Sequence, residues 1–257
     1  MWNLAGSPFD LTSRVAIVTG GGRGLGAALV MGLAQAGASI GVIGRRIEAC
    51  VEVAVQVRDA GGQAFPATAD VTNPESVHAS FEQVARVLGP VDILVNNAGI
   101  SPFSAPLDST RLSGWHKVLE TNLTGALICT QAVVRSMQER GRGKIINVAS
   151  AAGAVSSPGI GAYGVSKAGL IHLTRQLAAE QGPYNIQVNA IAPGYMDVGV
   201  SERIQNQEAF FAHIIERTPM KRIGRASELV GAVILLASDA SSYITGQILF
   251  IDGGFLA

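Results

Sequence analysis

The sequence has few charged residues, few aromatic residues and only two cysteines. Charged residues make up 15% of the 257 positions, and lysine plus arginine equal aspartate plus glutamate at 19 each. There is no basic run, so the electrostatic footprint of a nucleic-acid-binding protein is missing. Cys50 and Cys129 follow no CxxC or zinc-ligand spacing, which favours two buried thiols in a reducing compartment. With 48% apolar residues the chain can instead fill a large core.

The sequence also lacks a targeting segment and a metal-binding pattern. Residues 1–14 contain no basic region followed by a long apolar stretch, so no signal peptide is predicted. Residues 24–44 carry no charge over a length that is sufficient to span a bilayer. However, they include Gln35, Ser39 and six glycines. A helix ending near Gly37 and a buried strand explain this stretch better than a membrane span. We expect a cytoplasmic protein that binds neither membrane nor nucleic acid.

No metal site is predicted, because the four histidines are scattered without ligand spacing: His78, His116, His172 and His213.

What the sequence does contain is a repeated alternation of β-branched runs and helical stretches. Seven runs are predicted to form strands: residues 14–20, 39–43, 63–68, 91–95, 144–148, 186–192 and 248–251. Predicted helices include residues 25–35, 47–60, 160–181 and one that begins at a capping box, Thr72 to Glu75.

Strands that alternate with helices predict an α/β fold with right-handed crossovers. We therefore expect a Rossmann-type, doubly wound, mostly parallel seven-stranded sheet flanked by helices. No linker, internal repeat or low-complexity segment divides the chain. Residues 1–257 are accordingly expected to form a single domain.

A glycine-rich loop, residues 19–26 (TGGGRGLG), joins the first predicted strand to the first helix. Glycines allow the backbone to approach a pyrophosphate, and the helix N-terminus favours its negative charge. The spacing of Gly20, Gly24 and Gly26 differs from GxGxxG, so an ordinary tight turn stays open for this loop alone.

Polar or small residues follow four later strands at their carboxyl ends. Asp70 follows the third strand, residues 96–99 (NNAG) the fourth, Ser150 the fifth, and Pro193 with Gly194 the sixth. Ligands of open α/β sheets bind at this edge. Taken singly, Asp70 could cap a helix and residues 96–99 could form a turn. Their joint placement predicts one binding crevice.

Tyr163 and Lys167 are four residues apart in a predicted helix and therefore share one face. A free tyrosine has a pKa of about 10. A nearby lysine ammonium, or the positive nicotinamide of an oxidised cofactor, lowers that pKa towards the range useful for proton transfer. For an isolated YxxxK pattern, an ordinary surface pair is the alternative.

In combination these residues resemble the short-chain dehydrogenase/reductase family, in its single-domain branch. The resemblance rests on the glycine loop, on NNAG, on Asn122, and on Ser150 placed 13 residues before Tyr163-GVS-Lys167. It runs from about Leu11 to the C-terminus. Residues 222–257 are particularly similar to bacterial gluconate 5-dehydrogenases and 3-oxoacyl-carrier-protein reductases, although that likeness lies in scaffold residues and says little about substrate.

The resemblance implies a catalytic set of Asn122, Ser150, Tyr163 and Lys167. Tyr163 exchanges a proton with the substrate oxygen, and Ser150 hydrogen-bonds the same oxygen. Lys167 holds the nicotinamide ribose and lowers the pKa of the tyrosine, while Asn122 holds a water in a proton relay.

The resemblance also implies a dinucleotide site in which Asp70 and Val71 flank adenine and Pro193 and Gly194 turn against the nicotinamide. The full expected set is Gly20, Arg23, Gly24, Leu25, Gly26, Arg45, Asp70, Val71, Asn97, Ala98, Gly99, Tyr163, Lys167, Pro193 and Gly194. The chain departs from the family at Val198, where a threonine often bonds the carboxamide.

We expect NADP(H) to be preferred, with NAD(H) possible. The acidic residue that holds the free ribose of NAD belongs at the end of the second strand, where this chain has Gly44 followed by Arg45. Arg45, with Arg23 in the glycine loop, could bind a 2′-phosphate. The alternative is that both arginines are solvated surface charges.

The expected activity is that of a carbonyl reductase acting on a small-molecule ketone or secondary alcohol. Alternatives are a sugar-acid dehydrogenase of the gluconate 5-dehydrogenase kind, a 3-oxoacyl reductase and a non-catalytic dinucleotide-binding regulator. A methyltransferase would have no use for YxxxK.

A lid near residues 195–220, including Phe210 and Phe211, is expected to cover an apolar part of the substrate, although both could be core residues. The resemblance also implies a homotetramer, formed through two helices and the C-terminal strand.

Overall fold

The computed structural model describes residues 6–101, 105–156, 158–198 and 208–257. These residues form a seven-stranded sheet in the order β3-β2-β1-β4-β5-β6-β7, and every neighbouring pair is parallel. The strands are β1 (Val15–Thr19), β2 (Ser39–Gly44), β3 (Ala64–Thr68), β4 (Ile93–Asn96), β5 (Gly143–Val148), β6 (Ile186–Pro193) and β7 (Ile248–Ile251). The predicted doubly wound fold is therefore confirmed. Strand order reverses between β1 and β4, which makes their carboxyl ends the switch point of the sheet.

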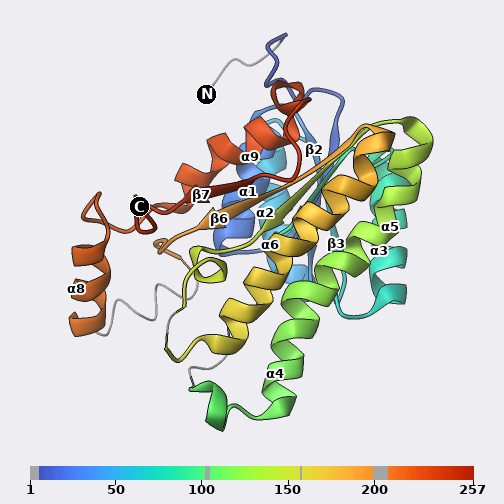
Figure 1. The fold of residues 1–257 in the computed structure, drawn as a ribbon. Coiled ribbons are helices and arrows are strands. Elements are labelled where there is room, and N and C mark those ends of the chain that lie inside the picture. The colour runs from blue at the N-terminus through green and yellow to red at the C-terminus, as the bar shows by residue number, and fades with distance from the viewer. Residues whose placement is uncertain (1–5, 102–104, 157, 199–207) are drawn as a thin grey trace.

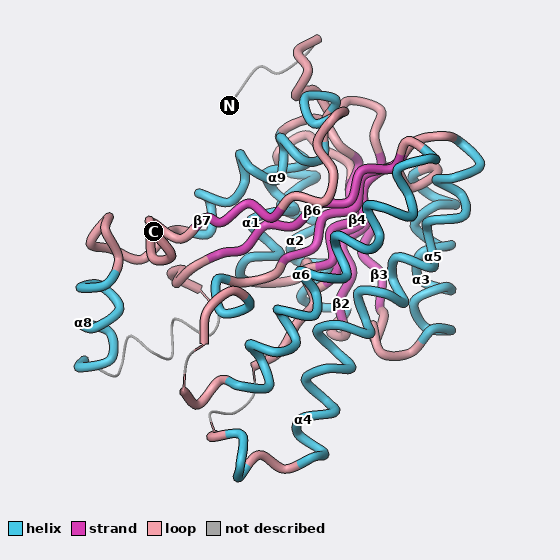
Figure 2. Tube along the Cα trace, viewed as in Figure 1, coloured by secondary structure: helices cyan, strands magenta, loops and turns pink. Residues whose placement is uncertain are grey.

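Helices cover both faces of the sheet (Figures 1 and 2). The helices of the first layer are α1 (Gly24–Gln35), α2 (Ile47–Asp59) and α9 (Val230–Ala237). Those of the second layer are α3 (Pro74–Leu88), α5 (Gly125–Arg140) and α6 (Gly161–Gln181). Two further helices, α4 (Leu112–Leu119) and α8 (Glu208–Arg217), lie beyond the carboxyl-end side of the sheet in Figure 1.

Strand β1 shows how the sequence specifies these layers. All five of its residues are buried. Because successive side chains of a strand point to opposite faces, Ala16 and Val18 pack into the α1, α2 and α9 layer, whereas Val15 and Ile17 pack into the opposite one. A strand covered on both faces needs an unbroken apolar run, which is what the sequence supplies.

Residues 24–44 form helix α1 followed by strand β2. This confirms the prediction of a helix and a buried strand in place of a membrane span. In the part of the chain that the structure describes, no helix is long and apolar enough to cross a membrane.

The predicted capping box at the start of α3 is wrong in its cap residue. Asn73 is the N-cap, its side chain accepts a hydrogen bond from Ser76 N at 2.8 Å, and Pro74 occupies the first turn. Thr72 instead forms hydrogen bonds with Asp70, whose Oδ1 accepts from both Thr72 N and Thr72 Oγ1. The asparagine side chain lies one residue closer to the helix and takes the capping position.

Candidate active site

The glycine loop between β1 and α1 is shaped by backbone conformations that only glycine adopts readily. Gly20 and Gly24 have φ angles of +65° and +54°. A Cβ at Gly26 would lie 2.1 Å from Gly20 O, so the loop closes tightly on itself. Above Gly24 the space is open, because the nearest atom to a Cβ there would be Val198 Cβ at 4.0 Å. An exposed loop that opens a helix N-terminus in this way fits a pyrophosphate.

The NNAG segment after β4 supports this loop. Asn97 Nδ2 donates to Thr19 O at 2.9 Å and to Gly20 O at 3.2 Å. Thr19 Oγ1 accepts in return from Asn97 N and Ala98 N. Asn96 points into the sheet, where its Nδ2 donates to Asn147 Oδ1 of β5 at 2.9 Å. The side chains of the two asparagines therefore fix the loop and the strand beneath it.

Asp70 and Arg45 lie near each other at the carboxyl ends of β3 and β2. Hydrogen bonds from Thr72 lower the pKa of Asp70 below its usual range, and the charge of Arg45 lowers it further. The carboxylate therefore stays ionised at neutral pH, and Oδ1 fastens the turn before α3. Val71 is buried beside it.

The two arginines predicted to meet a 2′-phosphate are both on the surface at this edge. Arg23 and Arg45 are exposed, and neither forms an ion pair with another described residue. Arg23 lies in the glycine loop, and Arg45 directly follows β2. Two guanidinium groups that have no ion-pair partner in the described part of the chain therefore lie at the edge of the sheet that carries the glycine loop.

Ser150, Tyr163 and Lys167 come together as the sequence predicts. Ser150 follows β5, and its side chain is close enough to Tyr163 to lower the pKa of the phenol through hydrogen bonding. Tyr163 and Lys167 lie one turn apart on α6, with Lys167 Nζ 5.7 Å from the centre of the tyrosine ring. The lysine is only 4% exposed, and its Nζ donates to Val148 O at 2.7 Å.

The electrostatics of this trio differ from the prediction. Burial raises the pKa of Tyr163, and the hydrogen bond with Ser150 lowers it by a smaller amount. Burial also lowers the pKa of Lys167 to about 8, because desolvation disfavours its charged form. Desolvation outweighs the hydrogen bond with Ser150, so the phenol of Tyr163 is protonated at neutral pH in the protein by itself.

Asn122 lies in a short π-helix, Glu120–Thr124, between α4 and α5. Single π turns inside α-helices are frequent at functional sites. The side chain is 1% exposed, and its Oδ1 accepts from Ile100 N at 2.7 Å. Its Nδ2 donates to Ile100 O at 2.9 Å and to Ser166 Oγ at 3.0 Å. A Cβ at Gly99 would lie 3.3 Å from Asn122 Oδ1 and 3.6 Å from Lys167 Nζ, so Asn122 and Lys167 border the same glycine.

The turn after β6 also requires glycine. Gly194 N donates to Ile251 O at 3.0 Å, and a Cβ at Gly194 would lie 2.8 Å from Asp252 Cα. Pro193 ends β6 and is buried. The turn is thus held against the end of β7, at the same sheet edge as Ser150.

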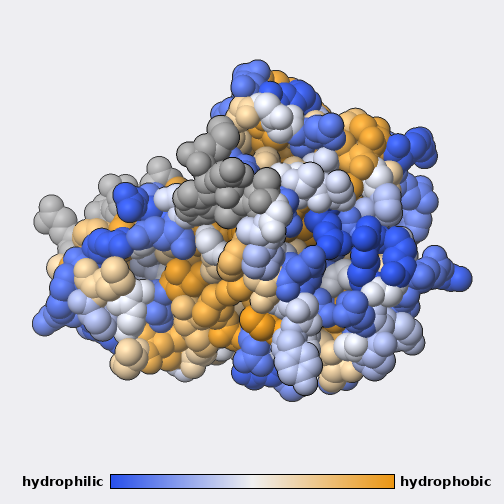
Figure 3. Space-filling view, turned by 90° about the horizontal axis from the view of Figure 1, so that it is seen from above, coloured by the Kyte–Doolittle hydropathy of each residue, from blue (hydrophilic) through white to orange (hydrophobic). Residues whose placement is uncertain are grey.

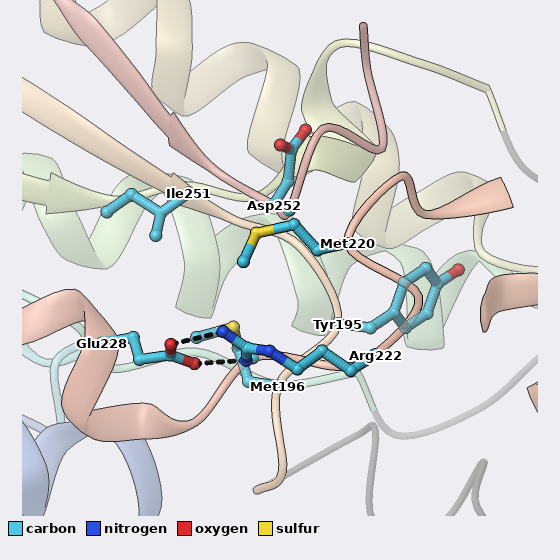
Figure 4. Close-up of a pocket in the computed structure, with 9 residues that line it drawn as sticks. Tyr195, Met196, Met220, Arg222, Glu228, Ile251 and Asp252 are labelled. Atoms are coloured by element: carbon cyan, nitrogen blue, oxygen red, sulfur yellow. Dashed lines mark hydrogen bonds and ion pairs between the residues drawn. The ribbon is translucent and has the colours of Figure 1, made fainter.

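Beyond this turn lies a pocket that the sequence analysis did not predict (Figure 4). Its lining includes Tyr195, Met196, Met220, Arg222, Ile251 and Asp252. Arg222 forms a two-pronged ion pair with Glu228, both contacts being 2.7 Å. The sequence contains no motif for this pocket, because its lining residues come from separate segments of the chain.

The predicted lid lies only partly within the described residues. Residues 199–207 and the side chain of Phe210 lie outside them. Phe211 is half-buried on α8, and Val198 is half-buried against the core cluster of the α1, α2 and α9 layer.

Comparisons with known proteins identify the family of the chain. A family model described as "Enoyl-(Acyl carrier protein) reductase" matches residues 20–256. The chain belongs to the short-chain dehydrogenase/reductase family, which confirms the resemblance, and it is an oxidoreductase acting on CH–OH and C=O groups.

Individual relatives cover almost the whole chain. The gluconate 5-dehydrogenase of Gluconobacter oxydans (strain 621H) is 39% identical over 246 residues, which are 96% of each chain. A 3-oxoacyl-[acyl-carrier-protein] reductase of Synechocystis is 35% identical over 96% of this chain and 98% of its own. The crystal structure of a gluconate 5-dehydrogenase from Burkholderia cenocepacia J2315, in complex with NADP and tartrate, matches with a TM-score of 0.93 and 40% identity over 97% of both chains.

Proposed function

We propose that the protein transfers hydride between NADP(H) and a ketone or secondary alcohol, most simply as a carbonyl reductase. The observation that carries this proposal is the placement of Ser150, Tyr163 and Lys167 together at the carboxyl edge of the sheet. The open glycine loop at the same edge supports a dinucleotide as the partner of that trio. A non-catalytic dinucleotide-binding regulator would have no need to keep all three side chains.

The bound dinucleotide supplies or accepts the hydride, and the residues of this chain orient the substrate and move the proton. In reduction, Tyr163 Oη donates its proton to the carbonyl oxygen. Ser150 Oγ donates a hydrogen bond to the same oxygen and stabilises its developing charge. Lys167 and Asn122 hold the ribose and the proton path, as the family resemblance implies. In oxidation Tyr163 takes the proton of the hydroxyl, which requires its deprotonated form.

The dinucleotide site we propose comprises the glycine-loop residues, Asp70 and Val71 for adenine, and residues 97–99 with Pro193 and Gly194 near the nicotinamide. NADP(H) is favoured over NAD(H) by Arg23 and Arg45, which are exposed and unpaired among the described residues. The B. cenocepacia relative with bound NADP supports the same preference.

A sugar-acid dehydrogenase of the gluconate 5-dehydrogenase kind is the second candidate function. It is favoured by the names of the relatives at 39% and 40% identity. Because such a substrate is also a secondary alcohol or ketone, the reacting residues are the same in both cases. A 3-oxoacyl reductase is supported by a relative at 35% identity.

The deciding experiment is a substrate screen that follows the absorbance of the reduced dinucleotide. The panel contains gluconate, 5-ketogluconate, simple ketones and a 3-oxoacyl thioester, each with both cofactors. We expect NADPH-dependent reduction of at least one carbonyl compound, and the preferred class chooses between the candidates. Tight NADPH binding by fluorescence with no turnover of any class would overturn the proposal and favour the regulator.

We further propose that residues 1–257 form one domain with a substrate lid near residues 195–220. Helix α8 stands apart from the sheet, on the side of its carboxyl ends (Figure 1). Arg217, at the end of α8, lies 4.8 Å over the ring of Phe255, and that ring packs edge-on against Tyr195 at 5.5 Å. These contacts tie the end of α8 to the segment that follows Gly194.

We propose that the protein is a homotetramer in the cytoplasm. β7 is an edge strand, and its neighbouring residues Leu249 and Phe250 are 39% and 38% exposed although they point to opposite faces. An uncovered apolar edge strand favours pairing with another chain. One face of the molecule also carries a patch of apolar side chains between hydrophilic margins (Figure 3).

The buried free thiols of Cys50 and Cys129 fit a reducing compartment, which supports the proposed location in the cytoplasm.

Light scattering coupled to size-exclusion chromatography tests this assembly. We expect the mass of four chains, and we expect Phe250→Lys to shift it towards smaller species. Tyr243→Lys serves as a control for added surface charge, because Tyr243 is fully exposed and lies in a loop outside the helices and β7. A monomer for the unmodified protein would refute the tetramer.

A further inference from the structure

Ser166 is a buried hydroxyl inside the catalytic segment to which no role has been assigned above. It lies on α6 between Tyr163 and Lys167 and is fully buried, with 0% exposure. Its Oγ donates to Tyr163 O at 2.7 Å and accepts from Asn122 Nδ2 at 3.0 Å. One hydroxyl thus joins the backbone of the reactive tyrosine to the side chain of the asparagine in the π-helix.

The bonds around Ser166 use each available hydrogen once. Asn122 Nδ2 has two hydrogens, one for Ile100 O and one for Ser166 Oγ, while Asn122 Oδ1 accepts from Ile100 N. The single hydroxyl hydrogen of Ser166 goes to Tyr163 O. The result is a continuous path from the loop after β4, through the π-helix, to the first turn of α6. Removing Ser166 Oγ leaves a buried amide hydrogen without a partner, which is costly in a protein interior.

The same arrangement occurs at a second place on α6, farther from the tyrosine. Thr174 Oγ1 donates to Leu170 O at 2.8 Å and accepts from Asn147 Nδ2 at 2.9 Å. Thr174 is also fully buried and lies eight residues after Ser166, or about 12 Å along the helix axis. A buried asparagine bound to a helix hydroxyl is therefore a structural device that this chain repeats. Only the Ser166 pair reaches a residue of the reactive centre.

We infer that Ser166 is a positioning residue for the oxidoreductase reaction, because its hydroxyl fixes the first turn of α6 against Asn122 and thereby sets where Tyr163 meets Ser150 and the substrate oxygen. This inference rests on the proposed function. The hydroxyl takes no part in the proton transfer itself. It acts by holding the backbone of Tyr163 and the amide of Asn122 in one geometry, and a misplacement of about 1 Å can slow a reaction that depends on alignment by about 100-fold.

The test compares Ser166→Ala with Thr174→Val, which removes the equivalent hydroxyl at the second place while keeping the side-chain shape. Both variants should lose a similar amount of thermal stability. Only Ser166→Ala is expected to lower kcat, by about tenfold, with the KM of the dinucleotide within twofold of the unmodified enzyme. The pH at which kcat for oxidation rises should move upward by at least half a pH unit, since misalignment weakens the Ser150 hydrogen bond that lowers the pKa of Tyr163.

A second readout needs no substrate. The difference in tyrosinate absorbance between the protein and its Tyr163→Phe variant reports the titration of Tyr163, and it is measured with and without Ser166→Ala. An upward shift supports the inference. An unchanged titration, a kcat within twofold of the unmodified enzyme, or an equal loss of kcat in Thr174→Val overturns it.

If Ser166→Ala does not fold, Ser166→Cys keeps a side chain of the same connectivity with a weaker donor, and it is judged by the same measurements. If the unmodified protein turns over no substrate, the proposed function fails, whereas the tyrosine titration still decides the role of Ser166.

Discussion

Replacing Tyr163 by phenylalanine is expected to lower kcat by about 10²–10⁴-fold, the usual contribution of a general acid. The change removes the transferable proton and leaves the ring that faces Lys167 Nζ at 5.7 Å. Affinity for the dinucleotide should hardly change, because the phenol is expected to act on the substrate oxygen. Steady-state kinetics give kcat, and a fluorescence titration gives the affinity.

Lys167→Ala is the informative partner of that variant. The lysine is expected to serve both the ribose and the tyrosine, so its loss should reduce kcat and dinucleotide affinity together. Tyr184→Phe is the control, since Tyr184 is 47% exposed, lies at the far end of α6 and should retain full activity. If Tyr163→Phe keeps more than about a tenth of the activity on the best substrate, Tyr163 is not the acid.

The pH dependence should differ between the two directions. Because burial raises the pKa of Tyr163, the protonated form predominates at neutral pH and reduction should proceed there without activation. Oxidation requires the deprotonated form and should become faster as the pH rises. Lys167, with a pKa lowered to about 8, loses its charge at a lower pH than Tyr163 loses its proton, so reduction should decline above about pH 8. Initial rates of oxidation and of reduction, measured from pH 6 to pH 10, test both expected pH dependences.

The sequence predicts the fold well because the local signals agree with one another. The run that forms β1 is apolar at four of its five positions, as a strand covered on both faces requires, and glycines mark where the chain turns. All seven predicted strands end within two residues of the observed strand ends. The cap of α3 was misplaced because Thr72 and Asn73 are both good N-cap residues, and the sequence does not show that Thr72 forms local hydrogen bonds with Asp70 instead.

The sequence predicts which residues form the candidate site better than it predicts their pKa values. Spacing alone brings Tyr163 and Lys167 to one helix face, but the balance between burial and charge depends on packing that the sequence does not show. Ser166 lies within the YxxxK pattern, yet its partner Asn122 is 44 residues away. Only the three-dimensional structure shows that the two meet.

A preference for NADPH over NADH is the remaining large effect, and it depends on the end of β2. Gly44 occupies the place of the acid that would hold the free ribose of NAD, and Arg45 follows it, exposed and close enough to Asp70 to lower the pKa of that carboxyl. An exposed arginine without an ion pair to another described residue is available to a 2′-phosphate. Charge-assisted hydrogen bonds of this kind contribute about 1.5–3 kcal/mol each.

Arg45→Ala is therefore expected to weaken NADPH by about 10–100-fold and to leave NADH nearly unchanged. Arg46→Ala, the exposed neighbour at the N-terminus of α2, is the matched control for loss of one positive charge. Equal losses in both variants would show a general electrostatic effect in place of a contact by Arg45. Arg23→Ala tests the second expected contact in the same titration.

Gly44→Asp should move the preference towards NADH, because a carboxylate repels the 2′-phosphate and accepts from a free ribose hydroxyl. A Cβ at Gly44 would lie 2.9 Å from Cys50 Sγ, so the thiol has to shift and part of any loss is steric. Gly44→Ala introduces the same Cβ without the charge and isolates that part. The ratio of kcat/KM for the two dinucleotides is measured for the unmodified enzyme and for both variants. A clear NADH preference in the unmodified enzyme would overturn the assignment of Arg45, whatever the variants do.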